Sequence, residues 1–141
     1  MRLAVIDANI ALSWVLSDEP SSKAILRLLD DFIAEKVRLI APSLWEYEVH
    51  NVLRVSIARD RINEQQAQRA SQSLLKLRIE LYEFRPLLID AWNLALAYNL
   101  SIYDASYLAL ANQQRCEFYS SDRQLIKAAQ KSGLIHLPEE F

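Results

Sequence analysis

Residues 2–12 read RLAVIDANIAL, and this stretch decides the kind of fold to expect. The first five residues form a short apolar run that is typical of a buried strand. Asp7 ends the run, and a helical pattern follows directly over residues 9–17. In open sheets built from such strand–helix units, ligands bind beyond the carboxyl ends of the strands. Acidic residues that directly follow strands are therefore the first candidates for chemistry.

The alternation of strands and helices continues along the chain. We expect further strands at residues 37–41, 117–120 and 134–137. The other expected helices lie at residues 22–36, 44–53, 63–79, 87–99, 101–114 and 122–132. This alternation predicts a parallel sheet flanked by helices, in an α/β protein. A length of 141 residues, without a repeat or a linker, suits one domain over residues 1–141.

The composition excludes several classes of protein. Cys116 is the only cysteine, so intrachain disulfides and a cysteine-based metal cluster are ruled out, and we expect a buried thiol there. Gly133 is the only glycine and is expected just after a helix, so glycine-rich phosphate loops cannot be built. No apolar run reaches the roughly 18 residues of a membrane helix, and the chain opens without a cationic leader. These features predict a cytoplasmic protein with no membrane partner.

The net charge of -2 is not typical of a nucleic-acid-binding protein, but the basic residues are unevenly distributed. They outnumber acidic residues between positions 54 and 85. Most of them fit solvated helix faces, while Arg54 and Arg59 are candidates for a substrate-binding rim beside an acidic cleft. The tryptophans fall in apolar runs and are expected in the core or in a partner interface: Trp14, Trp45 and Trp92.

The predicted helix LWEYEVHNVL, at residues 44–53, places a carboxylate among apolar side chains. At about 100° per residue, Glu48 falls in the middle of an arc formed by Leu44, Trp45, Val49, Val52 and Val55. An unpaired buried carboxylate costs several kcal/mol, and a basic partner, protonation or a metal ion offsets that cost. No lysine or arginine shares the centre of the arc. A metal ion is the remedy that would also account for other acids nearby.

Three aspartates occupy comparable positions. Asp7 follows the first strand, while Asp104 and Asp122 open predicted helices in line with their inward-facing residues. Each has a plain structural explanation as a cap or first-turn acid, worth about 1 kcal/mol, but that explanation does not extend to Glu48 in mid-helix. Asn9 is either a first-turn residue or a polar neighbour that orients a ligand or a water molecule.

A cluster of these four carboxylates predicts a divalent metal site. Carboxylates about 4 Å apart repel each other by roughly 4 kcal/mol at an effective dielectric constant near 20, so a cation is needed between them. Ligation by oxygen alone favours Mg²⁺ or Mn²⁺. Zinc is disfavoured because the two histidines are isolated, with His50 on an exposed helix face and His136 in a predicted terminal strand.

Four segments together resemble the PIN domain, and specifically the VapC-like toxins of bacterial toxin–antitoxin pairs: VIDANIAL, APSLWEYEVHNVL, SIYDASYLALA and FYSSDRQL. The likeness runs in order through nearly the whole chain. It implies an α/β/α sandwich with a central, mostly parallel sheet. The acidic quartet of the family falls on Asp7, Glu48, Asp104 and Asp122. Ser120 stands where a small hydroxyl residue commonly supports the last acid, and Asn9 stands where some members carry serine or threonine.

The resemblance also implies dependence on Mg²⁺ or Mn²⁺ and endonucleolytic cleavage of RNA. It implies a dimer, and neutralisation by a small antitoxin whose tail reaches into the acidic groove. The leading hypothesis is therefore metal-dependent hydrolysis of phosphodiester bonds, with the quartet holding one or two ions. Two other hypotheses stay open. One is a phosphatase that uses Asp7 as nucleophile, although Asn9 stands where a second carboxylate is usual. The other is a non-catalytic module that binds metal or RNA.

Overall fold

A computed structural model describes residues 1–16 and 22–133 of the chain. Within these residues, four parallel strands form one sheet in the order β3-β2-β1-β4. The strands are β1 (Arg2–Ile6), β2 (Val37–Pro42), β3 (Glu80–Tyr82) and β4 (Glu117–Tyr119). The described α-helices are α1 (Ala8–Val15), α2 (Lys23–Ile33), α3 (Leu44–Ala58), α4 (Glu64–Lys76), α5 (Leu88–Tyr98), α6 (Ile102–Gln114) and α7 (Arg123–Ser132). A short 3-10 helix, η1 (Arg85–Leu87), precedes α5.

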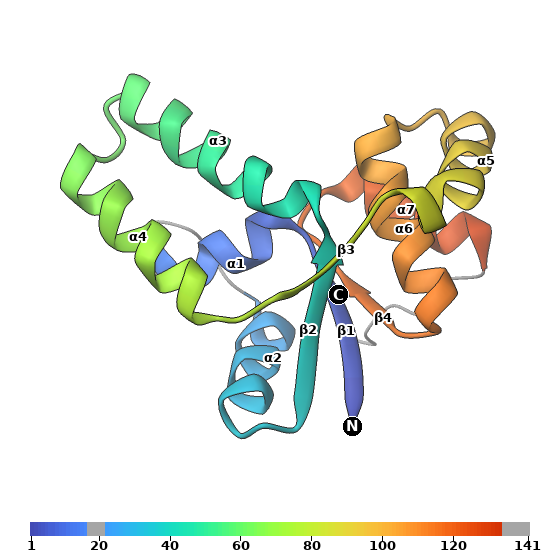
Figure 1. Cartoon of the computed structure of the whole chain (residues 1–141), viewed down its shortest axis with the longest axis horizontal. Helices are drawn as coiled ribbons and strands as arrows, with labels where there is room; N and C mark the ends of the chain where they lie inside the picture. The colour runs from blue at the N-terminus through green and yellow to red at the C-terminus, as the bar shows by residue number, and fades with distance from the viewer. Residues whose placement is uncertain (17–21, 134–141) are drawn as a thin grey trace.

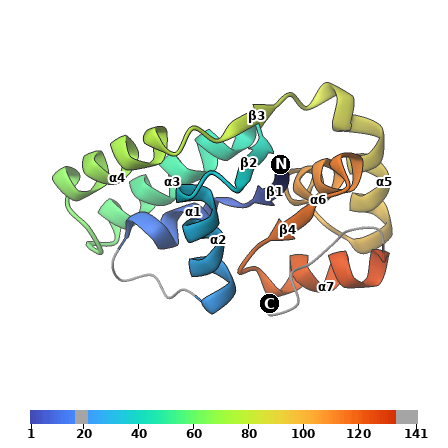
Figure 2. The same cartoon turned by 90° about the horizontal axis from the view of Figure 1, so that it is seen from below.

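The helices cover both faces of the sheet. Helices α1 to α4 lie on one side of it and α5 to α7 on the other, as two successive views make clear (Figures 1 and 2). The sheet is therefore the middle layer of an α/β/α sandwich, which confirms the predicted fold class. None of the helices in the described part of the chain is both long and apolar enough to span a bilayer.

The core lies on both faces of the sheet, and α6 is its most continuously buried helix. The central strands β1 and β2 bury Val5 and Ile40 completely. Seven consecutive residues of α6, from 105 to 111, are buried as well. A helix buried around its whole circumference belongs to the interior of a domain rather than to its surface. Asp104, in the first turn of α6, is therefore carried by a rigidly packed helix.

Most predicted elements are confirmed, and the strand β3 was missed. The predicted helix 63–79 ends early, at Lys76, because Arg78 adopts a left-handed backbone conformation with φ of 52°. Strand β3 has three residues with little burial, so it lacks an alternating pattern. It is held by pairing with β2 and by Arg38, which donates two hydrogen bonds to Glu80 Oε1 and one to Oε2. The strand predicted at residues 134–137 lies outside the described residues.

The predictions for the single glycine and the single cysteine agree with the structure. Gly133 follows α7 with φ of 63°, as expected for a helix C-cap. Cys116 is buried, and burial raises the pKa of its thiol to about 11. The thiol is therefore protonated at neutral pH and is a poor nucleophile.

Candidate functional site

A pocket of about 240 Å³ opens at the carboxyl ends of β1 and β4. The four predicted acids all line it: Asp7, Glu48, Asp104 and Asp122. Asn9 lines the pocket too, from the first turn of α1. The topology explains the convergence, because parallel strands end at one edge of the sheet and the helices that follow begin there.

Asp7 is both a helix cap and a wall of the pocket. Its Oδ1 accepts a hydrogen bond from the backbone N–H of Ile10 at 3.1 Å, which caps α1. Its Oδ2 accepts a hydrogen bond from the hydroxyl of Ser120. Burial raises the pKa of Asp7 to about 6, with a smaller contribution from the charges of Glu48 and Asp122. Asp7 therefore caps α1 and also lines the pocket.

Ser120 connects two of the acids. Its side chain is fully buried after β4, and its hydroxyl oxygen accepts a hydrogen bond from the backbone N–H of Asp122 at 3.0 Å while it donates to Asp7. Asp122 in turn caps α7, where its Oδ1 accepts from the backbone N–H groups of Gln124 and Leu125 at 3.0 and 3.2 Å. One buried hydroxyl thus links Asp7, after β1, to Asp122, after β4.

Glu48 lies at the edge of the buried stripe of α3, which corrects the sequence-based placement in its middle. Trp45, Val49 and Leu53 are buried in that helix, whereas Val55 is 37% exposed. The half-buried Glu48 carboxylate faces the pocket, and its Oε1 accepts a hydrogen bond from the hydroxyl of Tyr107 at 2.5 Å. Burial raises the pKa of Glu48, and the charge of Asp104 adds to the shift.

Asp104 is a first-turn acid of α6 and not its cap, so of the two expected structural roles only the first-turn role is confirmed. Ser101 is the N-cap of α6, and its Oγ accepts a hydrogen bond from the backbone N–H of Asp104 at 3.0 Å. The Asp104 side chain lines the pocket instead. Burial raises its pKa, and the charge of Asp122 adds to the shift.

The pocket concentrates negative charge that no basic lining residue offsets. In residues 1–16 and 22–133, no three acidic, histidine or cysteine side chains are arranged to hold a metal ion directly. The donor set nevertheless fits Mg²⁺ or Mn²⁺, because Mg²⁺ in particular binds through one or two carboxylates and retains several water molecules. Burial and neighbouring carboxylates raise the pKa of Asp7, Glu48 and Asp104, and a cation would offset both effects.

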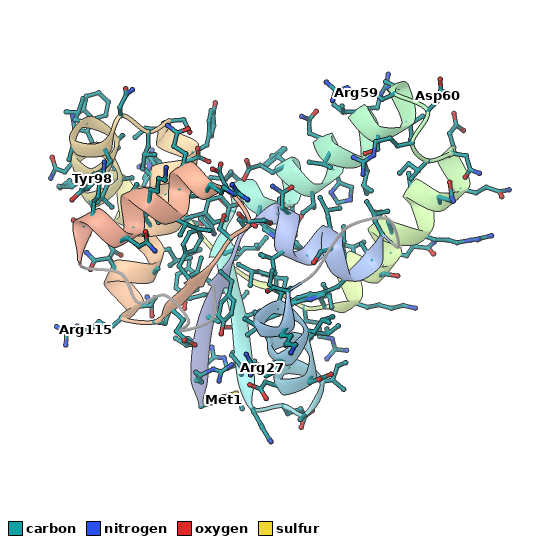
Figure 3. The ribbon with its side chains drawn as sticks, turned by 180° about the vertical axis from the view of Figure 1, so that it is seen from behind. Met1, Arg27, Arg59, Asp60, Tyr98 and Arg115 are labelled. Atoms are coloured by element: carbon teal, nitrogen blue, oxygen red, sulfur yellow. The ribbon has the colours of Figure 1, made fainter. Side chains whose placement is uncertain are left out.

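The two predicted substrate-binding arginines lie outside the pocket lining. Arg54 is exposed on α3, two turns beyond Glu48. Arg59 follows the last residue of α3 and lies at the outer end of the arm formed by α3 and α4 (Figure 3). At about 1.5 Å per residue, Arg59 is roughly 16 Å from Glu48 along the helix axis.

Sequence reasoning missed two polar residues of the pocket, Asn51 and Tyr107. Each lies three residues after a predicted acid, Asn51 after Glu48 and Tyr107 after Asp104. Helical residues separated by three positions share a face, so this spacing was the available signal. Burial and the Glu48 carboxylate raise the pKa of Tyr107, so its hydroxyl stays protonated and acts as a donor.

Comparison with known proteins agrees with this geometry. Residues 4–131 match the PIN domain family model. The chain belongs to the PIN domain family. This PIN domain is 33% identical over 128 residues to VapC ribonuclease Mb0985 of Mycobacterium bovis, covering 91% of this chain and 92% of the relative. It is also 33% identical over 130 residues to ribonuclease VapC1 of Mycobacterium tuberculosis, with the same coverage.

Solved structures share the fold of this PIN domain at lower sequence identity. PAE2754 from Pyrobaculum aerophilum aligns with a TM-score of 0.67 at 22% identity, covering 90% of this chain and 86% of that one. Mycobacterium tuberculosis VapC20, described as a sarcin-ricin loop cleaving toxin, aligns with a TM-score of 0.64 at 16% identity, covering 89% and 94%. VapBC2 from Rickettsia felis, solved with a DNA fragment from its promoter, aligns with a TM-score of 0.64 at 14% identity, covering 96% of this chain and 97% of that one.

Proposed function

We propose that this PIN domain is an endoribonuclease that hydrolyses RNA phosphodiester bonds with Mg²⁺ or Mn²⁺, and that it is the toxin of a toxin–antitoxin pair. The observation that carries the proposal is the convergence of four carboxylates in one pocket without a basic lining residue. The relatives that are 33% identical over 91% of the chain are named as ribonucleases. A cytoplasmic location follows from such a role, because the RNA is there.

The residues of the pocket have distinct roles in this mechanism. Asp7, Glu48 and Asp104 would hold the ion directly or through water, and Asp122 would be a further ligand or would orient a water molecule. When bound, a divalent ion lowers the pKa of a water molecule and neutralises charge on the phosphate and on the leaving oxygen. No side chain needs to form a covalent bond. Ser120 keeps Asp7 and Asp122 in register through its two hydrogen bonds.

RNA is negatively charged, so the acidic pocket attracts the scissile phosphate only when a cation is bound. Arg54 and Arg59 lie on the exposed side of α3 beyond the pocket. We assign them to phosphates that flank the cleavage site, where basic side chains position a nucleic acid without reading its sequence.

The test of the proposed function is RNA cleavage by the purified protein with Mg²⁺, with Mn²⁺ and with a chelator. Cleavage is expected with either ion and not with the chelator. A non-catalytic module would gain thermal stability from Mn²⁺ and leave RNA intact, which would contradict the proposal. A phosphatase would yield a phosphorylated Asp7 with small phosphate esters, and trapping that species would favour the alternative.

The partner expected for such a toxin is a small antitoxin. VapBC2, a structural neighbour, was solved on promoter DNA, which places its components together on DNA. The acidic pocket of this chain favours a basic side chain from the antitoxin tail, because that side chain supplies the positive charge the pocket lacks. Co-expression with the product of the adjacent gene is expected to block RNA cleavage.

Helix α5 supplies a surface for the proposed homodimer. Ile89, Trp92 and Leu96 are exposed by 75%, 55% and 70%, and they form one stripe opposite the buried Ala91 and Leu94. Contiguous apolar stripes on monomers usually mark interaction sites. A helix stripe also suits a two-fold axis, because the same patch then serves both copies.

Replacing Ile89 by aspartate is expected to weaken dimerisation by at least about tenfold, because the substitution places two charges in one apolar interface. Ile89 is mostly exposed, so the subunit should still fold. Analytical ultracentrifugation measures the monomer–dimer equilibrium. Ile33→Asp, which changes a residue 70% exposed on α2, is the matched control and should leave the equilibrium unchanged. Equal dimerisation of both variants would contradict the assignment of α5.

A further inference from the structure

Tyr107 is anchored in the core and reaches the acidic pocket with its hydroxyl. The side chain is 1% exposed, and its ring lies against the ring of Phe118 on β4, with centroids 6.4 Å apart. The hydroxyl lines the pocket side of α6 and donates its hydrogen bond to Glu48 Oε1 at 2.5 Å. Packing fixes the ring, so the hydroxyl oxygen has a defined position before any ligand binds.

This hydrogen bond joins two helices that otherwise pack on different parts of the molecule. Helix α3 contacts α1 and α4, whereas α6 contacts α5, β1 and β4, and both touch β2. Figure 1 shows the two helices diverging from the carboxyl ends of the strands. The pocket occupies the space between them, so a contact across it controls how the two walls are placed.

Glu48 needs such a contact more than Asp7 and Asp122 do. Asp7 and Asp122 are held by backbone N–H groups as helix caps, and both are linked to Ser120. Glu48 lies in mid-helix, where no backbone N–H is free to hold it, and its longer side chain has more rotamers to lose. A donor on the opposite wall is therefore the means by which this carboxylate is directed inward.

We propose that Tyr107 is a positioning residue that holds Glu48 in the orientation required to bind the divalent ion. This inference rests on the proposed function. The hydroxyl occupies one lone pair of Oε1 and leaves Oε2 available to the ion. Loss of a group that orients a metal ligand typically weakens metal binding by roughly 10- to 100-fold. For Tyr107 we expect a loss of about 10-fold.

The test is a double-mutant cycle on Mn²⁺ affinity, measured by electron paramagnetic resonance of the free ion. The proteins are the parent, Tyr107→Phe, Glu48→Ala and the double variant. Tyr107→Phe is expected to weaken Mn²⁺ binding by about 10-fold in the parent and to have no further effect when Glu48 is alanine. Cleavage should require about 10-fold more Mn²⁺ and recover most of its rate at saturating Mn²⁺, because the ligand itself remains.

Phenylalanine keeps the ring and its contact with Phe118, so the variant is expected to fold, and a thermal melt in chelator checks this. The matched control is Tyr119→Phe, since the Tyr119 hydroxyl also donates to a carboxylate, Glu117 Oε1 at 3.2 Å, outside the pocket. Unchanged Mn²⁺ affinity in Tyr107→Phe, or an equal loss in both backgrounds, would overturn the inference. A parent that binds no Mn²⁺ would contradict the metal site of the proposed function itself, and the inference with it.

Discussion

Replacing Glu48 by glutamine is expected to reduce RNA cleavage by at least about 100-fold, because loss of a ligand that stabilises the metal-bound transition state by about 3 kcal/mol has that effect. Glutamine has nearly the shape of glutamate and still accepts a hydrogen bond, so Tyr107 keeps its partner. What changes is the charge. The substitution removes one of the four carboxylates that line the pocket and reduces its attraction for the ion.

The same substitution is expected to leave the metal-free protein at least as stable as the parent. Burial raises the pKa of Glu48, which means that the folded protein bears a cost for the charged form. Neutral glutamine removes this cost. Cleavage rates over a Mn²⁺ titration and thermal melting in chelator measure the two effects separately. Loss of activity with preserved stability indicates a functional acid.

Glu46→Gln is the matched control for Glu48→Gln. Glu46 lies on the same helix, two residues away, and its side chain is exposed. The control removes the same formal charge without touching the pocket lining. Its cleavage rate should equal that of the parent. If Glu48→Gln cleaved RNA as fast as Glu46→Gln, Glu48 would have no part in the reaction.

The fold was predictable because local patterns determine it. Apolar runs such as residues 2–6 are followed by polar caps and amphipathic helices, and each signal is contained in a few adjacent residues. Strand β3 was missed for the opposite reason. Its three residues are mostly exposed, and its pairing with β2 and its contact with Arg38 both involve residues that are distant in the sequence.

Asp7 and Asp122 were predictable because each follows a strand, and Glu48 was predictable because it breaks a local rule. Asp104 was predictable because it opens a helix in line with its inward-facing residues. The relationships among these acids were not predictable. The capping role of Asp7 was expected, but the capping role of Ser101 and the link that Ser120 makes between Asp7 and Asp122 depend on side-chain directions that a single sequence does not specify. Tyr107 is the clearest case, because its spacing fits a buried core residue equally well and only its hydroxyl reveals the contact with Glu48.

Asp7 gives the metal-free protein an unusual dependence of stability on pH. Its pKa in the folded protein is about 6, compared with 3.8 for an ordinary aspartate, and burial is the main cause. A carboxyl group whose pKa is raised by folding binds its proton more tightly in the folded state. Its contribution to stability is therefore fully present below pH 3.8 and is lost as the pH rises through about 6. A difference of about 2 pKa units corresponds to about 3 kcal/mol.

The free energy of unfolding of the parent is therefore expected to fall by about 2 kcal/mol relative to Asp7→Asn between pH 4 and pH 7, in chelator. Asparagine is as good an N-cap as aspartate, so it preserves the hydrogen bond from the Ile10 N–H. It also replaces Oδ2, the acceptor of the Ser120 hydroxyl, by an NH₂ donor, and because this loss does not depend on pH, the pH-dependent part of the difference reports the titration. Denaturant unfolding of both proteins across this range gives the difference directly. At pH 7, Mn²⁺ should raise the free energy of unfolding of the parent but not that of Asp7→Asn, because the ion takes the place of the proton on the carboxylate. A difference that stays constant with pH would show that the buried carboxyl group titrates like an exposed one, and the electrostatic argument for a cation in this pocket would lose its strongest support.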